Sequence, residues 1–211
     1  MKKLLVILFA AFLATGISAQ PAKTVKLNAP NKQRGESTMQ ALEKRKSTRE
    51  YAARELSLQD LSDLLWAANG MNRPADNKRT APTAMNKQEI DVYVIKPEGA
   101  YLYDAKAHEL KLVIAKDLRE FAADRQAFAK EAPVILLIVA DMGRVGGNSE
   151  AFGVFAAIDA GIVSQNISLF CAGCGFGTVP RGYMNKEALA KELGLGESYQ
   201  LYLNHPVGYF K

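Results

Sequence analysis

Residues 150–172 read EAFGVFAAIDAGIVSQNISLFCA, and this run constrains the architecture more than any other part of the 211-residue chain. Alanine, isoleucine, valine and phenylalanine occupy nearly every face of the helix that the run predicts, and Gly173, Gly175 and Gly177 break it. A helix this apolar must be buried in a large core or between two subunits. We therefore expect it to lie at the centre of the fold.

Short runs of β-branched and aromatic residues around this helix predict strands. Residues 134–140 form a continuous apolar run, which is typical of a central strand covered on both faces. The other expected strands are residues 90–96, a hairpin made of 99–104 and 108–113, and residues 199–203.

Helical spacing and capping residues predict the remaining elements. The expected helices are 37–45 with Ser37 or Thr38 as N-cap, 57–69 ended by Gly70, 116–130, and 185–193 ended by Gly194. Residues 71–82 are polar and contain proline, which indicates a loop. Helices and strands alternate, so the pattern indicates an α+β or α/β domain with one mixed sheet.

The N-terminus has the pattern of a secretory signal peptide over residues 1–19. Two lysines precede the apolar run 4–13, and small residues lead to a cleavage point after Ala19. We expect an exported protein, in a bacterium a periplasmic one. Residues 20–37 are polar and predict a flexible arm, and residues 38–211 form one domain. Beyond the leader, we expect no segment long and apolar enough to span a bilayer.

The charge balance argues against nucleic acid as a partner. The formal net charge is +5, and loss of Lys2 and Lys3 with the leader lowers it to +3. The positive charges form no long stripe, so we do not expect nucleic-acid binding.

Residues 45–49 read RKSTR and place three cations and two hydroxyls in five positions. Arginine forks and hydroxyl groups together can hold one phosphate monoester. The alternative is a solvated basic helix end, where cations sit well against the C-terminal dipole. Residue type alone leaves both interpretations open.

Several motifs occur in one order along the chain. They are RKSTR, LLWAANG at 64–70, PTAMNKQ at 82–88, DVYVI at 91–95, APVILLIVAD at 132–141, DAGIVSQNISL at 159–169, GFGTVPRG at 175–182 and HPVGY at 205–209. This series resembles the nitroreductase family of flavin enzymes, and LLWAANG with the 99–113 hairpin resembles its SagB/thiazoline-oxidase-like branch.

The resemblance implies an α+β fold with a mixed central sheet flanked by helices. It also implies an intertwined homodimer with swapped terminal segments and one FMN in each of two interface clefts. The implied chemistry is a two-electron ping-pong reduction of a nitroarene, quinone or enone, with NADH or NADPH as a candidate donor. The flavin carries this chemistry, so no side chain is expected to be catalytic in its own right.

The resemblance also assigns the basic cluster. Arg45 and Arg49 would pair with the FMN phosphate, and Ser47 would bond to the phosphate or the ring. Lys46 would contact the pyrimidine edge, where a cation favours the reduced flavin. Relatives carry a further Lys and Arg after the PVG motif. Here either Lys211 takes that role alone, or the set of phosphate contacts is incomplete.

Two other motifs complete the expected flavin contacts. Asn86 matches a flavin-contacting asparagine of the family, although many members of the SagB-like branch carry a small residue there. The expected contacts from the partner subunit are Pro82, Thr83 and Ala84. Gln88 is a weaker candidate, since a loop glutamine that bonds backbone is an equal alternative.

The turn at 180–182 matches the place where the family's backbone N–H groups meet the flavin ring. The expected contacts are Pro180, Arg181 and Gly182. Many relatives carry Glu in place of Arg181, so the arginine would add positive charge above the ring, and the alternative is a surface residue.

The remaining reactive residues form no recognisable centre. Cys171 and Cys174 leave open a thiol–disulfide protein, although two small core residues are the simpler interpretation. His108 and His205 lie far apart without paired acids, so we expect no metal site. Asp159 is expected to cap a segment or to bond across a subunit interface. A flavin-binding protein without turnover is a further alternative.

Overall fold

The computed structural model describes residues 23–211, so the predicted signal peptide lies outside the described residues. Its centre is a seven-stranded sheet in the order β1-β6-β5-β4-β7-β9-β8. The strands are β1 Thr24–Lys26, β4 Ile90–Lys96, β5 Gly99–Asp104, β6 Glu109–Ile114, β7 Val134–Asp141, β8 Phe176–Thr178 and β9 Tyr199–Tyr209. All of these pairings are antiparallel, where we had expected a mixed sheet.

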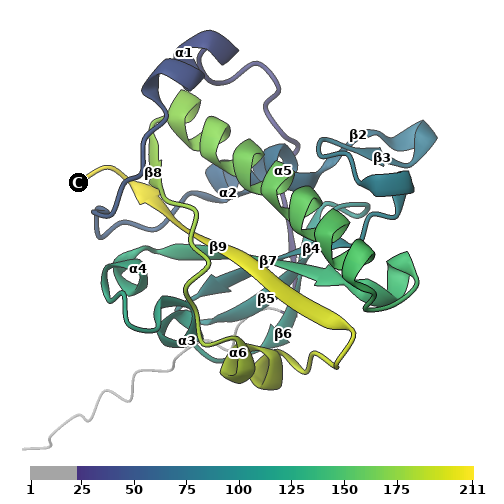
Figure 1. Cartoon of the computed structure of the whole chain (residues 1–211). Helices are drawn as coiled ribbons and strands as arrows, with labels where there is room; N and C mark the ends of the chain where they lie inside the picture. The colour runs from purple at the N-terminus through teal and green to yellow at the C-terminus, as the bar shows by residue number, and fades with distance from the viewer. Residues whose placement is uncertain (1–22) are drawn as a thin grey trace, which may run out of the picture.

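Helices cover both faces of the sheet and make three layers (Figure 1). The helices are α1 Thr38–Lys44, α2 Leu58–Asn69, α3 Arg119–Ala123, α4 Phe128–Glu131, α5 Glu150–Cys174 and α6 Lys186–Leu193. Short elements are β2 Met71–Arg73, η1 Pro74–Asp76, β3 Lys78–Arg79, η2 Ala84–Asn86 and η3 Met142–Val145. Helices α2 and α5 pack on one face, and α3 and α6 pack on the other. The predicted α+β class is confirmed.

Strand β7 explains why the layers form. Its even-numbered residues, from Val134 to Ala140, belong to the core under α2 and α5. Its odd-numbered residues Ile135, Leu137 and Val139 belong to the core under α3 and α6. A strand buried on both faces needs apolar side chains at every position, which is why this run lacks alternation.

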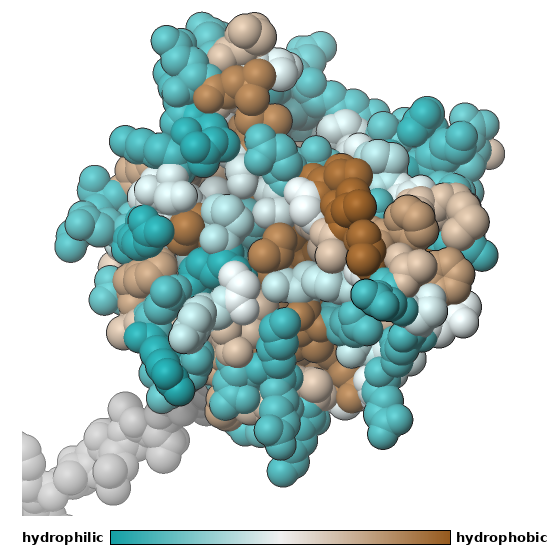
Figure 2. Space-filling model, viewed as in Figure 1, coloured by the Kyte–Doolittle hydropathy of each residue, from teal (hydrophilic) through white to brown (hydrophobic). Residues whose placement is uncertain are grey.

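Helix α5 lies across one face of the sheet and is buried on one side only (Figure 1). It begins at the Ser149 cap and ends at Gly175, whose φ of 79° suits glycine. Val154, Phe155 and Ile158 remain 54%, 45% and 54% exposed. Figure 2 shows a band of apolar atoms over this helix and another over α1.

The length of α5 corrects one expectation from the sequence. By length and composition alone, Glu150–Cys174 could cross a membrane, whereas we had expected no such segment. One side of the helix packs against the sheet, with Ala156, Ala160, Val163 and Ile167 all fully buried there. A core helix of a soluble domain meets the same criterion of length and composition.

The predicted flexible arm is wrong for its described part. Strand β1 pairs with β6, in the register Val25 with Leu110. Further on, the Arg34 guanidinium lies 2.8 Å from the carboxylates of both Asp60 and Asp63 of α2. These contacts hold residues 24–34 against the domain. The carboxylates on α2 need a cationic partner, and the sequence around Arg34 does not show that it supplies one.

Three other boundaries differ from the prediction. The helix expected at 116–130 is two short helices, because Asp124 adopts φ of 48° and ends α3. The loop expected at 71–82 contains the β2–β3 hairpin. Strand β9 continues past 203 to Tyr209, since pairing with β7 and β8 outweighs the local effect of Pro206.

Candidate functional site

The 45–49 segment leaves α1 and runs beside strand β8. A capping box of Ser37 and Gln40 begins α1, and Arg45 ends it with an extended backbone. The Thr48 N–H then donates to the Thr178 carbonyl at 2.9 Å. The Ala52 N–H donates to Tyr209 O at 3.0 Å, at the end of β9. The backbone is therefore held by the sheet, and the Arg49 guanidinium lies 5.9 Å from the centre of the Phe128 ring.

The cations of this cluster are exposed and not neutralised. Among residues 23–211, no carboxylate lies within ion-pair distance of Arg45, Lys46 or Arg49. By contrast, the neighbouring Lys44 pairs with Glu36. Three adjacent cations without counter-charges produce a positive potential that suits a dianion such as a phosphate monoester.

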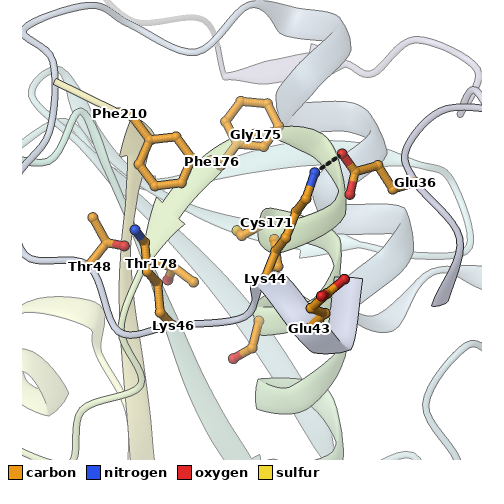
Figure 3. Close-up of a pocket in the computed structure, with 12 residues that line it drawn as sticks. Glu36, Glu43, Lys44, Lys46, Thr48, Cys171, Gly175, Phe176, Thr178 and Phe210 are labelled. Carbon is orange, nitrogen blue, oxygen red and sulfur yellow. Dashed lines mark hydrogen bonds and ion pairs between the residues drawn. The ribbon is translucent and has the colours of Figure 1, made fainter. Parts of the chain in front are cut away.

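A cavity of about 480 Å³ opens next to the cluster. Lys46 and Thr48 lie at its rim, and the rings of Phe176 and Phe210 form an apolar wall (Figure 3). Its other side is made by Lys44, Glu36, Glu43, Ser168, Cys171, Ala172, Gly175 and Thr178. Of the 45–49 cluster only Lys46 and Thr48 line this cavity, whereas the Arg49 guanidinium lies 5.9 Å from the centre of the Phe128 ring. Aromatic walls with an unpaired cation at the rim suit a planar ligand, and the volume falls in the usual range for small-molecule sites. The lining therefore fits the ring of FMN, with Lys46 as the cation beside it.

A buried histidine supports the floor of this cavity. His205 is fully buried and bonds to Ser164 Oγ at 2.7 Å and to Thr178 Oγ1 at 3.1 Å. Burial lowers the pKa of His205 to about 3, so the imidazole stays neutral at physiological pH. His108 instead bonds to Tyr103 and to the Asn28 carbonyl. Neither histidine belongs to a metal-ligand cluster in the part of the chain that the structure describes.

Gly177 lets the 45–49 segment approach β8. A Cβ atom at this position would lie 2.8 Å from Thr48 Cγ2 and 3.2 Å from Thr48 Cβ. We expect Gly177→Ala to push Thr48 away and to displace the adjacent cations, with a cost of about 1–3 kcal/mol in the free energy of unfolding. FMN binding should weaken in the same variant, as measured by fluorescence titration. Gly153→Ala, where a Cβ would meet nothing within 4 Å, is the control.

The 180–182 turn corrects two expectations about its backbone. Pro180 has no N–H group to offer a ligand. The Arg181 N–H donates to Asn204 O at 2.9 Å, so it already has an acceptor. Gly182 is exposed, and its N–H donates to no described residue. Within this turn, only Gly182 keeps a backbone donor for a ligand.

The alternative of a surface position for the Arg181 side chain is wrong. The residue is 5% exposed. Its guanidinium donates to the carbonyls of Ala122 at 3.1 Å and Ala123 at 2.8 Å, and to Asn204 Oδ1 at 2.6 Å. It also bonds to Gln126. Arg181 thus joins α3 to the sheet, which no local pattern indicates.

The 82–88 loop lies near the middle of α5, away from the cluster. The Ala84 N–H donates to Asp159 Oδ2 at 2.8 Å. Cys171, beside the cavity, is twelve residues further along α5, which is roughly 18 Å along a helix axis. One chain therefore brings the cluster, the 180–182 turn and the C-terminal Lys211 to the β8–β9 edge. It does not bring Pro82, Thr83, Ala84, Asn86 and Gln88 there.

Gln88 and Asp159 make contacts inside this chain. The Gln88 amide bonds to Arg79 at 3.0 Å and to Asn77 O at 2.5 Å, which matches the alternative of a loop residue that bonds backbone. Asp159 accepts the Ala84 N–H at the start of η2. Asp159 therefore acts as a cap within the subunit.

The two cysteines are free thiols and not a disulfide. Burial raises the pKa of both Cys171 and Cys174. Only Cys171 borders the cavity described above, and Cys174 lies beside Arg34 on another side of α5. A raised thiol pKa disfavours the reactive thiolate, so the thiol–disulfide interpretation gains no support.

Several lining residues were not identified from the sequence. Phe176 and Phe210 form the apolar wall, and Thr48 anchors the cluster. An aromatic between two glycines at 175–177 was a usable signal, because glycine often marks a close approach of backbone or ligand. Phe210 had no such signal.

Comparisons with known proteins identify the family. The family model described as the nitroreductase family matches residues 42–209. A protein of Methanocaldococcus jannaschii is 31% identical over 178 residues, which cover 78% of this chain and 87% of that one. A crystal structure from Ralstonia eutropha JMP134 is 38% identical, with a TM-score of 0.85 and 90% of each chain covered. Both are described as putative nitroreductases.

A more distant structure shares the fold. NADPH:FMN oxidoreductase from Vibrio harveyi, solved in complex with NAD⁺, has a TM-score of 0.62 at 18% identity and covers 82% of this chain and 69% of its own. Together with the family match over most of the chain, the cation cluster and the cavity, these similarities lead to one assignment. The chain belongs to the nitroreductase family and is an FMN-dependent, nitroreductase-like oxidoreductase.

Proposed function

We propose that this protein carries out two-electron ping-pong reduction of a small nitroaromatic, quinone or enone acceptor, with NADH or NADPH as the candidate donor. Bound FMN would accept two electrons from the donor and pass them to the acceptor. The observation that carries the proposal is the exposed group of three cations without carboxylate partners, of which Lys46 lines a cavity with aromatic walls.

The residues of the cluster would bind and orient the cofactor. Arg45 and Arg49 would hold the phosphate with charge-assisted bonds, and Ser47 would donate a further one. Lys46 reaches into the cavity, where its positive charge would stabilise negative charge on the ring. Lys211, next to the wall residue Phe210, would add positive charge at the same edge.

We propose a homodimer as the working form, and a second copy of this chain as the occupant of the exposed apolar face. The face consists of Val154, Phe155 and Ile158 on α5 with Met39 and Leu42 on α1, all exposed. An apolar patch of this kind marks an interaction surface. A second copy would also bring its own 82–88 loop toward the cavity, which one chain keeps apart. Analytical ultracentrifugation would distinguish dimer from monomer.

Export would place the enzyme where nicotinamide nucleotides are scarce. The leader pattern at 1–19 supports secretion, in a bacterium to the periplasm. NADH and NADPH are the first donors to test.

The absorption spectrum of the purified protein tests the proposal, followed by an anaerobic donor screen. We expect a yellow protein whose flavin bands bleach with a donor and return when a quinone or nitroarene is added. A colourless protein that takes up no added FMN would contradict cofactor binding. A yellow protein that no donor bleaches would favour flavin binding without turnover.

A further inference from the structure

Glu89 is a buried carboxyl group without a hydrogen-bond donor. The residue is 0% exposed and lies just before β4, where its carbonyl accepts the Asp141 N–H at 2.9 Å. Neither of its carboxylate oxygens accepts a hydrogen bond from any described residue. A buried carboxylate without donors is strongly disfavoured, so this group must carry or share a proton.

Three groups from three elements face Glu89. They are Asp159 of α5, Arg144 of η3 and Tyr202 of β9. The Arg144 guanidinium is engaged by Asp91, with two contacts of 2.9 and 2.8 Å. The Tyr202 hydroxyl donates to a backbone carbonyl of α5 at 3.0 Å. Asp159, which is itself 4% exposed, is therefore the group left to bond with Glu89.

Asp159 also holds the 82–88 loop. Its Oδ2 atom accepts the Ala84 N–H at 2.8 Å. Three residues of this loop have a left-handed backbone that is costly for side chains other than glycine. They are Met85, Asn86 and Gln88, with φ of 52°, 55° and 52°. A strained loop persists only where its surroundings hold it, and Asp159 supplies one of those contacts.

We propose that Glu89 and Asp159 hold one proton between them, and that this carboxyl–carboxylate pair positions the 82–88 loop. When the proton leaves to solvent, two buried negative charges face each other and the loop loosens. The pair acts through the loop and is a positioning device. Its relevance to the cofactor rests on the proposed function, in which this loop contacts FMN.

The direction of the pH effect follows from the surroundings of Glu89. Burial, with the neighbouring Asp159 carboxyl adding to it, raises the pKa of Glu89 to about 7 from its usual 4.5. The protonated pair stabilises the fold fully at pH values below the pKa of Glu89 in the unfolded chain. This stabilisation is lost as the pH rises through the pKa of Glu89 in the folded protein. The loop should therefore be most firmly held on the acid side of neutrality.

NMR of the flavin-free protein with ¹³C-labelled glutamate carboxyls tests the pair. We expect one glutamate signal to titrate near neutral pH, and to be missing in Glu89→Gln. The protection factor of the Ala84 amide should fall about tenfold between roughly pH 6 and pH 8 in the wild type. It should stay constant in Glu89→Gln, whose amide can donate to Asp159 at every pH.

Controls separate this inference from the proposed function. Glu131→Gln, at an exposed position of α4, should behave as the wild type does. A Glu89 signal that titrates at its ordinary value, or an Ala84 amide that responds equally in Glu89→Gln, would overturn the pair. If Glu89→Gln does not fold, the wild-type titration alone decides.

The link to the cofactor has its own test. With FMN bound, the rate of FMN release should rise over the same pH range in the wild type only, and a pH-independent rate of FMN release would remove the link to the cofactor. A protein that binds no FMN would contradict the proposed function and leave the first two measurements intact.

Discussion

Replacement of both Arg45 and Arg49 by alanine is expected to cause the largest loss of cofactor affinity. A hydrogen bond to a charged group contributes about 1.5–3 kcal/mol, so each arginine should account for roughly a 10- to 100-fold change in the dissociation constant of FMN. Neither arginine has a carboxylate partner among residues 23–211, and Arg49 lies 5.9 Å from the centre of the Phe128 ring, so their removal should lower the free energy of unfolding by no more than about 1 kcal/mol. Isothermal titration of the flavin-free variants with FMN measures the effect.

The matched control removes a positive charge from the opposite side of the sheet. Lys191 is exposed on α6, which covers the other face. Lys191→Ala should bind FMN with nearly the wild-type constant, since exposed charges beyond a Debye length are largely screened. An unchanged affinity in the double arginine variant would show that the phosphate binds elsewhere.

Replacement of Arg181 by methionine is expected to cause the largest loss of stability. The change keeps much of the volume but leaves the Ala122 carbonyl and Asn204 Oδ1 without the donor that Arg181 supplies in a buried place, and leaves the Ala123 carbonyl with the Gln126 N–H. The free energy of unfolding should fall by about 3–4 kcal/mol, because orphaned buried acceptors cost far more than an exposed bond contributes. Urea unfolding of the flavin-free protein measures it.

The same experiment distinguishes the structural role of Arg181 from an electrostatic role at the flavin. Arg125→Met, at an exposed position between α3 and α4, should change the free energy of unfolding by less than about 0.5 kcal/mol. A stable Arg181→Met protein with altered flavin chemistry would contradict the buried role. A destabilised protein, with normal affinity under folding conditions, would agree with it.

Where the physical signal is local, the sequence predicted structure well. The apolar run at 134–140 became β7, and the run at 150–172 became α5, because a hydrophobic pattern of this length identifies the element locally. The same pattern indicated burial on nearly all faces of α5, whereas within this chain only one side is buried. The helix at 57–69 was similarly clear, with Ser57 and Gly70 at its ends. The 116–130 segment failed because one left-handed residue, Asp124, interrupts a helical composition.

Part of the candidate site could be predicted from local sequence patterns, and part could not. The cluster at 45–49 is conspicuous in composition, and its three cations are exposed and without carboxylate partners among residues 23–211. Its role in phosphate binding stays a prediction. Arg181 was misplaced, because its four partners lie more than 20 residues away in the chain. Glu89 was overlooked, since nothing beside it in the sequence distinguishes a buried carboxyl from a surface one.

The sequence by itself determined the α+β class, the principal strands and helices, the family and the basic cluster that suits a phosphate. Only the tertiary structure decided that Thr48 lies against Gly177, that Arg181 is buried, and that the Glu89 carboxyl is buried without a hydrogen-bond donor among the described residues. The physical reason is the distance along the sequence over which each interaction acts. Propensity, capping and periodicity act over a few residues, whereas burial and charge pairing depend on which distant segments the sheet and α5 bring together.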